Sequence, residues 1–451
     1  MRVKSIPSWP PVEIPVIPGS PVPVSLYDSA SQSVRLVRGV DGDAGTVRLY
    51  VCGITPYDAT HLGHAATYLA FDTLLRALTQ AGHEVEYAQN ITDVDDPLFE
   101  RAAKVARPWQ DIALEQTDLF RSDMRALRVQ PPAEYVRVQD VVGDIADAVG
   151  RLLDAGFGYR VATEDADGED IYFDLAAAQA RTDFHVAGVS HFSPERLAAA
   201  FVEFGGDPER EGKRNPMDPL LWRAARDGEP SWQAPFGAGR PGWHVECAVI
   251  ATGTLGQTIT IQGGGRDLRF PHHEMSAAHA SALTGRTFAD FYAHAGLIAY
   301  DGEKMSKSLG NLVLVSNLTA AGHDPAAIRL ALLAHHYRED WEWRDADLAA
   351  AEARLALWRA AASRAVAGTD AGAGTDAGAG TDADDDAGTV AGTEATTEDR
   401  RGDRIQRLRE HLATDLDTPS ALREVDAWAA EPVPAADIIP VIDALLGIRL
   451  A

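Results

Sequence analysis

The sequence predicts an α/β protein with a parallel sheet, followed by a helical carboxyl-terminal region. An apolar run at residues 47–51 leads into a loop, and apolar residues at helical spacing follow the loop. Gly82 ends this helix, and alternating apolar residues from Val85 onward predict a second strand. This order is a strand–loop–helix–strand unit, the form that builds a parallel sheet. Beyond residue 312 the pattern is helical.

Composition narrows the class of protein. The chain has 451 residues, of which 45% are hydrophobic, enough for a real core and about two or three domains. Its formal net charge of −26 lowers the expectation of a nucleic-acid partner, because such proteins usually carry a basic face. There is no apolar run of about 18 residues and no signal-peptide pattern, so we expect a cytoplasmic protein without a membrane span.

Five parts are expected along the chain: an arm at 1–40, an α/β body at 41–312 with an insertion at about 135–235, a helical region at 313–367, a linker at 368–399 and a second helical region at 400–451. Seven of the 25 prolines precede Val24, which predicts an extended arm of ordered coil rather than a domain. The linker repeats Gly, Thr, Asp and Ala and holds nine acidic and no basic residues. It is expected to be disordered because it cannot bury enough apolar surface.

The loop after the first strand carries candidate site residues. Cys52 lies at the end of the strand, and His61 and His64 lie at the start of the helix. Ligands in open parallel sheets gather at the carboxyl ends of strands, and a helix N-terminus favours phosphate. The loop could therefore hold a metal at Cys52 and a phosphate at the two histidines. The alternative is that these residues share a loop by chance.

The chain has only two cysteines, Cys52 and Cys247, too few for a disulfide scaffold. Two free buried thiols are the alternative, but both cysteines lie beside histidines, which favours a metal site. Together with His272 they form a Cys2His set, which leaves the fourth position of a zinc ion open. An open zinc position suits a soft ligand such as a substrate thiol. The alternative is three unconnected polar residues, since the sequence alone does not show that they converge.

A second loop predicts a polyphosphate site. It reads Lys304-Met-Ser-Lys-Ser308 and places two flexible cations where they can close on phosphates. A pair of lysines more often belongs to a solvent-exposed surface. Its combination with His61-Leu-Gly-His64 favours the interpretation as a polyphosphate site. Residues 262–265, Gln-Gly-Gly-Gly, predict a turn at which the backbone approaches a ligand closely.

These motifs resemble the two signatures of class I aminoacyl-tRNA synthetases, and residues 50–58, 90–96, 242–247 and 270–274 resemble cysteinyl-tRNA synthetase. The resemblance covers most of residues 46–345. In that family a glutamate stands at the position of Ser276, and the carboxyl-terminal part is longer. Both departures match a sister family, the mycothiol-pathway ligases that join cysteine to glucosaminyl-inositol. In one loop this chain has Phe204 where the ligase family has Arg.

The resemblance implies a Rossmann-like class I synthetase catalytic domain at 41–312, followed by a helical stem-contact region. It implies that one Zn²⁺ on Cys52, Cys247 and His272 takes the thiolate of L-cysteine. His61 and His64 would act at the α-phosphate of ATP, and Lys304 and Lys307 at the β- and γ-phosphates, with Mg²⁺. The pocket for the substrate and its adenylate would comprise Cys52, Gly53, Ile54, Thr55, Thr67, Asn90, Ile91, Thr92, Trp243, Gly265, Arg266, Asp267 and Ile298.

The implied reaction joins L-cysteine to the amine of glucosaminyl-inositol by way of cysteinyl-AMP, in a monomer without a nucleic-acid or membrane partner. Three alternatives stay open. A cysteinyl-tRNA synthetase would need a basic surface for the acceptor stem. A catalytically inactive binding module would not need His61, His64, Lys304 and Lys307. A structural zinc protein would need a fourth protein ligand.

Overall fold

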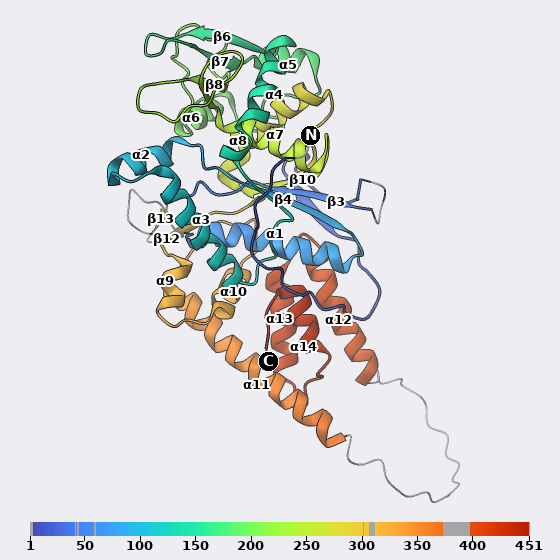
Figure 1. Ribbon diagram of the computed structural model, residues 1–451. Coiled ribbons are helices and arrows are strands. Elements are labelled where there is room, and N and C mark those ends of the chain that lie inside the picture. The colour runs from blue at the N-terminus through green and yellow to red at the C-terminus, as the bar shows by residue number, and fades with distance from the viewer. Residues whose placement is uncertain are drawn as a thin grey trace, which may run out of the picture.

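The computed structural model describes residues 3–40, 42, 45–57, 60–300, 302–305, 312–372 and 397–450. Its centre is a parallel sheet of five strands in the order β11-β10-β3-β4-β5 (Figure 1). The strands are β3 (Val47–Val51), β4 (Val85–Ile91), β5 (Glu134–Arg137), β10 (Ile259–Gly265) and β11 (Ala289–Ala295). The chain winds outward from β3 to β5 on one side and from β10 to β11 on the other. The order therefore reverses between β3 and β10, where open α/β sheets bind ligands.

Helix α1 (Leu62–Gln80) joins β3 to β4 and packs on one face of the sheet (Figure 1). The ring of His61 caps its start, because Nδ1 accepts a hydrogen bond of 3.1 Å from the backbone N–H of Gly63. The helix ends before Gly82, whose φ of +92° suits glycine. The opposite face is covered by α4 (Val142–Asp154), α7 (Trp243–Leu255) and α8 (His272–Thr284).

The expected insertion contains a sheet of its own, at the top of Figure 1. This antiparallel sheet has the order β6-β7-β8-β9 and consists of β6 (Gly158–Ala162), β7 (Glu169–Phe173), β8 (Leu220–Ala224) and β9 (Gly239–Pro241). The short helices beside it are α5 (Leu175–Arg181) and α6 (Pro194–Glu203). Between β4 and β5 lie α2 (Asp96–Val105) and α3 (Trp109–Ala126). The antiparallel sheet and α5 pack against α4, α7 and α8.

Helices make up most of the carboxyl-terminal part. They are α9 (Val315–Ala320), α10 (Pro325–Leu333), α11 (Asp345–Gly372), α12 (Thr397–Ala413), α13 (Thr418–Ala429) and α14 (Ile438–Leu446). A small sheet of β12 (Ile298–Tyr300), β13 (Glu303–Lys304) and β14 (Trp341–Glu342) connects them to the body. Of the expected linker, residues 368–372 belong to α11 and 397–399 to α12. Residues 373–396 lie outside the described part of the chain, so the expected disorder stays a prediction.

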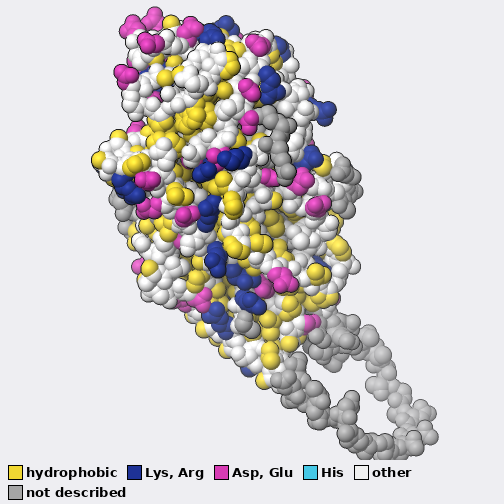
Figure 2. Space-filling view, viewed as in Figure 1, with side chains coloured by type: hydrophobic (Ala, Val, Ile, Leu, Met, Phe, Trp, Pro, Cys, Tyr) yellow, Lys and Arg dark blue, Asp and Glu magenta, His cyan; other side chains and the backbone are white. Residues whose placement is uncertain are grey.

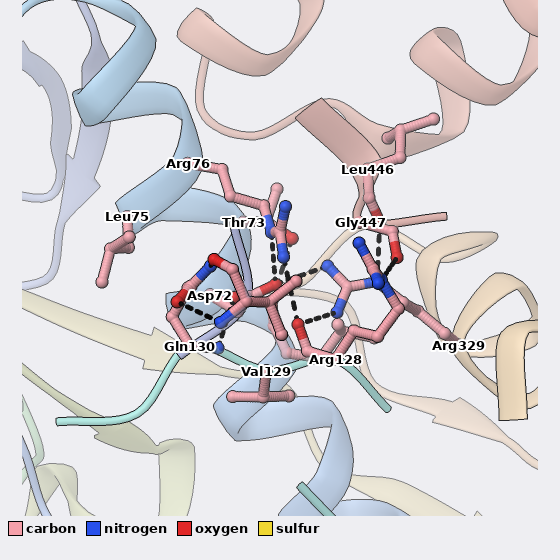
Figure 3. A network of polar contacts seen from close by, with 12 residues as sticks. Asp72, Thr73, Leu75, Arg76, Arg128, Val129, Gln130, Arg329, Leu446 and Gly447 are labelled. Atoms are coloured by element: carbon pink, nitrogen blue, oxygen red, sulfur yellow. Dashed lines mark hydrogen bonds and ion pairs between the residues drawn. The ribbon is translucent and has the colours of Figure 1, made fainter. Parts of the chain in front are cut away.

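A buried polar network ties α14 to α1 (Figure 3). Oδ2 of Asp72 accepts a hydrogen bond of 2.8 Å from Nε of Arg76 and also pairs with Arg329. Nε of Arg329 donates to the carbonyl of Leu446 at 2.6 Å, and Arg76 donates to the carbonyl of Asp443 at 3.0 Å. All three charged side chains are at most 1% exposed. The last helix is therefore joined to the helix that begins at His61.

The amino-terminal arm departs from the expected coil in one place. Residues 25–36 form an antiparallel hairpin of β1 (Ser25–Asp28) and β2 (Ser33–Leu36). The segment before it lies against the body, where Nε1 of Trp9 donates to the carbonyl of Val129 at 2.7 Å. The prediction missed the hairpin because the proline content that indicates coil stops at Pro23.

The predicted turn at residues 262–265 is wrong, because these residues continue strand β10. Gly263, Gly264 and Gly265 pair with β11 on one side, and Gly263 also pairs with β3 on the other. The glycines instead allow side chains of other elements to pack closely against strand β10. A Cβ on Gly263 would lie 2.3 Å from the ring of Phe71, and one on Gly264 would lie 3.0 Å from Nε2 of His273.

Among the described residues, no helix combines the length and the apolar character needed to cross a membrane. Figure 2 shows basic and acidic side chains intermingled on one face of the molecule, with apolar side chains between them.

Candidate active site

A cavity of about 500 Å³ opens at the carboxyl ends of β3 and β10, where the strand order reverses. Most of the residues expected to bind substrate lie on its wall: Cys52, Gly53, Ile54, Thr55, His61, His64, Thr67, Thr92, Trp243, Gly265, Asp267, His272 and Ile298. These residues are far apart in the sequence. The parallel sheet brings them together, as expected for a site at a switch point.

Three residues expected to bind the substrate or its adenylate do not line the cavity. Asn90 is fully buried, and its Oδ1 accepts a hydrogen bond of 2.8 Å from the backbone N–H of Gly53. Its Nδ2 donates to Oγ1 of Thr92 at 2.9 Å, so Asn90 holds two wall segments together. Ile91 is buried in the core. Arg266 points elsewhere, since it forms an ion pair of 2.5 Å with Asp340.

The expected lysine loop is only partly described. The backbone of Lys304 lies in β13, and the buried Met305 lines the cavity. The side chain of Lys304 and all of Lys307 lie outside the described residues. Their expected role at the β- and γ-phosphates stays a prediction.

The three expected metal ligands converge at the base of the cavity. The ligand atoms of Cys52, Cys247 and His272 all lie within 4.8 Å of one another, and all three residues are buried. The two sulfur atoms are 4.0 Å apart, and Nε2 of His272 is 3.2 Å from Sγ of Cys247. Two thiolates on a tetrahedral zinc ion are about 3.8 Å apart, given Zn–S bonds of about 2.3 Å. The donor set and its spacing therefore fit zinc.

The ring of His272 is held from two sides. Its Nδ1 lies 3.1 Å from Nδ1 of His244, and Trp243 stacks on it with ring centroids 4.2 Å apart. Burial lowers the pKa of both histidines, so both rings are neutral. Ser276 donates a hydrogen bond of 3.1 Å to the carbonyl of His244. Ser276 thus contacts the backbone of α7, at the position where the cysteinyl-tRNA synthetase family has a glutamate.

The other end of the cavity is suited to phosphate. His61 and His64 lie at the start of α1 with their rings stacked, 3.8 Å between centroids. The N-terminus of the 19-residue helix α1 adds a partial positive charge. The thiolate end and the phosphate end thus face one cavity.

One carboxylate at the wall was not singled out from the sequence. Oγ1 of Thr55 donates a hydrogen bond of 2.9 Å to Oδ2 of Asp95, which also accepts from the N–H of Asp96 through Oδ1. Burial raises the pKa of Asp95 to about 6. The only sequence signal was its place in the acidic stretch after β4, where turn-forming and site residues look alike.

Comparison with known proteins identifies the family. A protein of Clavibacter michiganensis subsp. michiganensis, named L-cysteine:1D-myo-inositol 2-amino-2-deoxy-alpha-D-glucopyranoside ligase, is 53% identical over 447 residues, 98% of each chain. A protein of the same name from Corynebacterium efficiens is 49% identical, covering 98% of this chain and all of the other. The chain belongs to this ligase family. A family model described as the catalytic domain of class I (C) tRNA synthetases also matches residues 40–353.

Solved structures agree with the fold of this ligase family. The methionyl-tRNA synthetase of Mycobacterium tuberculosis, solved with methionyl-adenylate, superposes with a TM-score of 0.61 at 16% identity. The match covers 89% of this chain and 92% of the other. The predicted fold class, a class I synthetase α/β domain followed by helices, is confirmed, and so is the resemblance to the mycothiol ligases.

Proposed function

We propose that the chain is an ATP-dependent ligase that activates L-cysteine as cysteinyl-AMP and transfers the cysteinyl group to the amine of glucosaminyl-inositol. The observation that carries this proposal is the two-ended cavity. Cys52, Cys247 and His272 lie at one end, and His61 and His64 lie at the N-terminus of α1 at the other. Cysteine can occupy the first end with its thiol while the α-phosphate of ATP occupies the second end.

The residues of the thiol end would hold Zn²⁺ with its fourth position open. The ion would bind the thiolate of cysteine and reject serine, because its soft ligands favour sulfur. Trp243, stacked on His272, limits the space beside the thiol. Thr55 would contribute its hydroxyl oxygen to the cysteine ammonium, since its proton is directed to Asp95.

The residues of the phosphate end act on the activation step. The carboxylate of cysteine attacks the α-phosphorus of ATP and displaces diphosphate. The histidines at the start of α1, with the helix N-terminus, would stabilise the charge that develops on the α-phosphate oxygens. Lys304 and Lys307, with Mg²⁺, would neutralise the leaving diphosphate. The acceptor amine then attacks the carbonyl carbon, the amide bond forms, and AMP leaves.

Measurement of AMP release with two alternative acceptors tests the reaction. Purified protein given ATP and cysteine is expected to release AMP when glucosaminyl-inositol is added, with formation of a cysteinyl amide detected by mass spectrometry. Bulk tRNA is the other acceptor, because the synthetase family model also matches this chain. Release that depends on tRNA and not on the amino sugar would contradict the proposal and indicate a cysteinyl-tRNA synthetase.

The contact between Thr55 and Asp95 predicts a pH dependence of cysteine binding. Because the pKa of Asp95 is about 6, its charged carboxylate accepts the Thr55 hydrogen bond above this pH, and below it the neutral carboxyl group is a weaker acceptor. The KM for cysteine in ATP–diphosphate exchange is expected to rise about tenfold as the pH falls from 8 to 5, the value of one charge-assisted hydrogen bond.

The matched variant for this prediction is Asp95→Asn, which does not titrate. Its KM is expected to be high at every pH between 5 and 8, with no step near pH 6. If the KM of wild type does not change around pH 6, or if the KM of Asp95→Asn changes there by the same factor, the charge of Asp95 does not determine how Thr55 contributes to cysteine binding.

A further inference from the structure

We propose that Ser29, in the turn of the amino-terminal hairpin, is a positioning residue for the metal centre. Its hydroxyl orients two buried histidines, His294 and His273, so that an N–H group is directed at the sulfur of Cys52. This inference rests on the metal role given to Cys52 under the proposed function. The amino-terminal arm would thereby contribute a residue to a site formed by segments far from it in the sequence.

The four side chains form a continuous chain of contacts. Oγ of Ser29 lies 2.8 Å from Nδ1 of His294, and Nε2 of His294 lies 2.9 Å from Nδ1 of His273. Nε2 of His273 lies 3.4 Å from Sγ of Cys52, within the range of a hydrogen bond to sulfur. None of the four residues is more than 4% exposed, so water does not replace a missing partner.

The direction of these hydrogen bonds follows from the state of the sulfur. Nδ1 of His273 and Nε2 of His294 lie 2.9 Å apart, so one of them donates and the other accepts, and a neutral imidazole offers one nitrogen of each kind. A metal-bound thiolate can only accept. His273 must then donate through Nε2, and its Nδ1 must accept from Nε2 of His294. The remaining Nδ1 of His294 needs a donor, which is the hydroxyl of Ser29.

The fold fixes Ser29 against strand β11. The backbone N–H of Ser29 donates to the carbonyl of Tyr292 at 2.9 Å, and Oδ1 of Asp28 accepts from the N–H of Tyr292 at 3.0 Å. Both bonds lie two residues from His294 on the same strand. On the other side, the absence of a side chain at Gly264 leaves the room that the ring of His273 occupies.

Loss of the Ser29 hydroxyl removes the only one of these donors that is free to rotate. Nδ1 of His294 then has lost the hydroxyl donor of Ser29. The pair of imidazoles is no longer held in the tautomer in which Nε2 of His273 donates to Cys52. A hydrogen bond to a metal-bound ligand orients that ligand and tunes its charge, and its removal typically costs 10- to 100-fold in metal affinity.

Metal binding by variants at this position tests the inference. Zinc affinity is measured on metal-free protein by competition with a chromophoric chelator, and Co²⁺ is added as a spectroscopic probe of the sulfur ligands. Ser29→Ala is expected to weaken zinc binding about tenfold or more and to shift the sulfur-to-cobalt charge-transfer band. Ser29→Thr, which keeps a hydroxyl, is expected to restore both to near wild-type values.

Ser31→Ala is the matched control, because this serine lies in the same hairpin but is exposed, and its hydroxyl lies 3.0 Å from Oγ of Ser33. It is expected to match wild type in affinity and spectrum. Wild-type affinity and an unshifted band in Ser29→Ala would overturn the inference, as would equal losses in Ser29→Ala and Ser29→Thr. Since neither ATP nor cysteine is present, these results are independent of the AMP-release assay. A wild-type protein that releases AMP but binds no zinc would overturn this inference and the metal role of Cys52, and would leave the proposed ligase reaction standing.

Discussion

Replacement of His272 by alanine is expected to abolish tight metal binding and to lower cysteine-dependent AMP formation more than about a hundredfold. The reason is geometric. Nε2 of His272 is one of only three protein donors that converge at the base of the cavity in the described part of the chain. Removing one of three ligands costs more than removing a supporting hydrogen bond, which alone costs 10- to 100-fold. Metal content by mass spectrometry and ATP–diphosphate exchange with cysteine measure the two effects.

The selectivity of the His272→Ala variant decides the role of the metal. We expect the preference for cysteine over serine to fall with metal content, because the thiol would lose its partner. His323→Ala is the matched control, since this histidine is partly exposed and pairs with Glu352 on the surface. A His272→Ala variant that keeps the wild-type ratio of cysteine to serine activation would show that selection does not depend on this centre.

The set of Cys52, Cys247 and His272 could be proposed from the sequence because each residue lies in a motif of its own. The motifs place each residue at the end of a strand or the start of a helix, and a parallel sheet gathers such ends along one edge. The chemistry of thiolate and imidazole then indicates a soft metal. Local pattern and topology placed each residue at this edge, and the family resemblance implied that the three share one metal.

The supporting residues could not be predicted in the same way. Ser29 and His294 carry no motif, and they meet only because the hairpin and β11 pack side by side. The glycines after Ile261 were expected in a turn, since backbone freedom is their usual use. Their actual role depends on Phe71 and His273, which approach from other elements. Contacts of this kind are set by tertiary packing, and a single sequence does not record them.

The buried pairing of Asp72 with two arginines could not be predicted either, and it leads to the largest expected effect on stability. Asp72→Asn is expected to lower the free energy of unfolding at pH 7 by about 3–5 kcal/mol. The side chain of Asp72 is fully buried, and its carboxylate pairs with Arg76 and Arg329 (Figure 3). An amide of the same shape leaves two guanidinium groups in the interior without their counter-charge. Urea-induced unfolding followed by circular dichroism measures the change.

The same pairing fixes how the effect depends on pH. Burial works against the charged carboxylate, but Arg76 and Arg329 outweigh it and hold the pKa of Asp72 below its usual value. The stabilisation is therefore present above the unfolded-state pKa of about 3.9 and is lost as the pH falls through the folded-state pKa. The difference between wild type and Asp72→Asn is expected to shrink below about pH 4.

A surface ion pair provides the control for Asp72→Asn. Arg107 and Glu115 form a contact of 2.9 Å, but their side chains are 48% and 57% exposed. Glu115→Gln is therefore expected to cost less than about 1 kcal/mol, since water screens such a pair. A loss below 1 kcal/mol for Asp72→Asn as well would mean that the backbone carbonyls of Leu446 and Asp443 are sufficient to hold both arginines. The attachment of α14 to α1 would then depend on hydrogen bonds rather than on the buried charge.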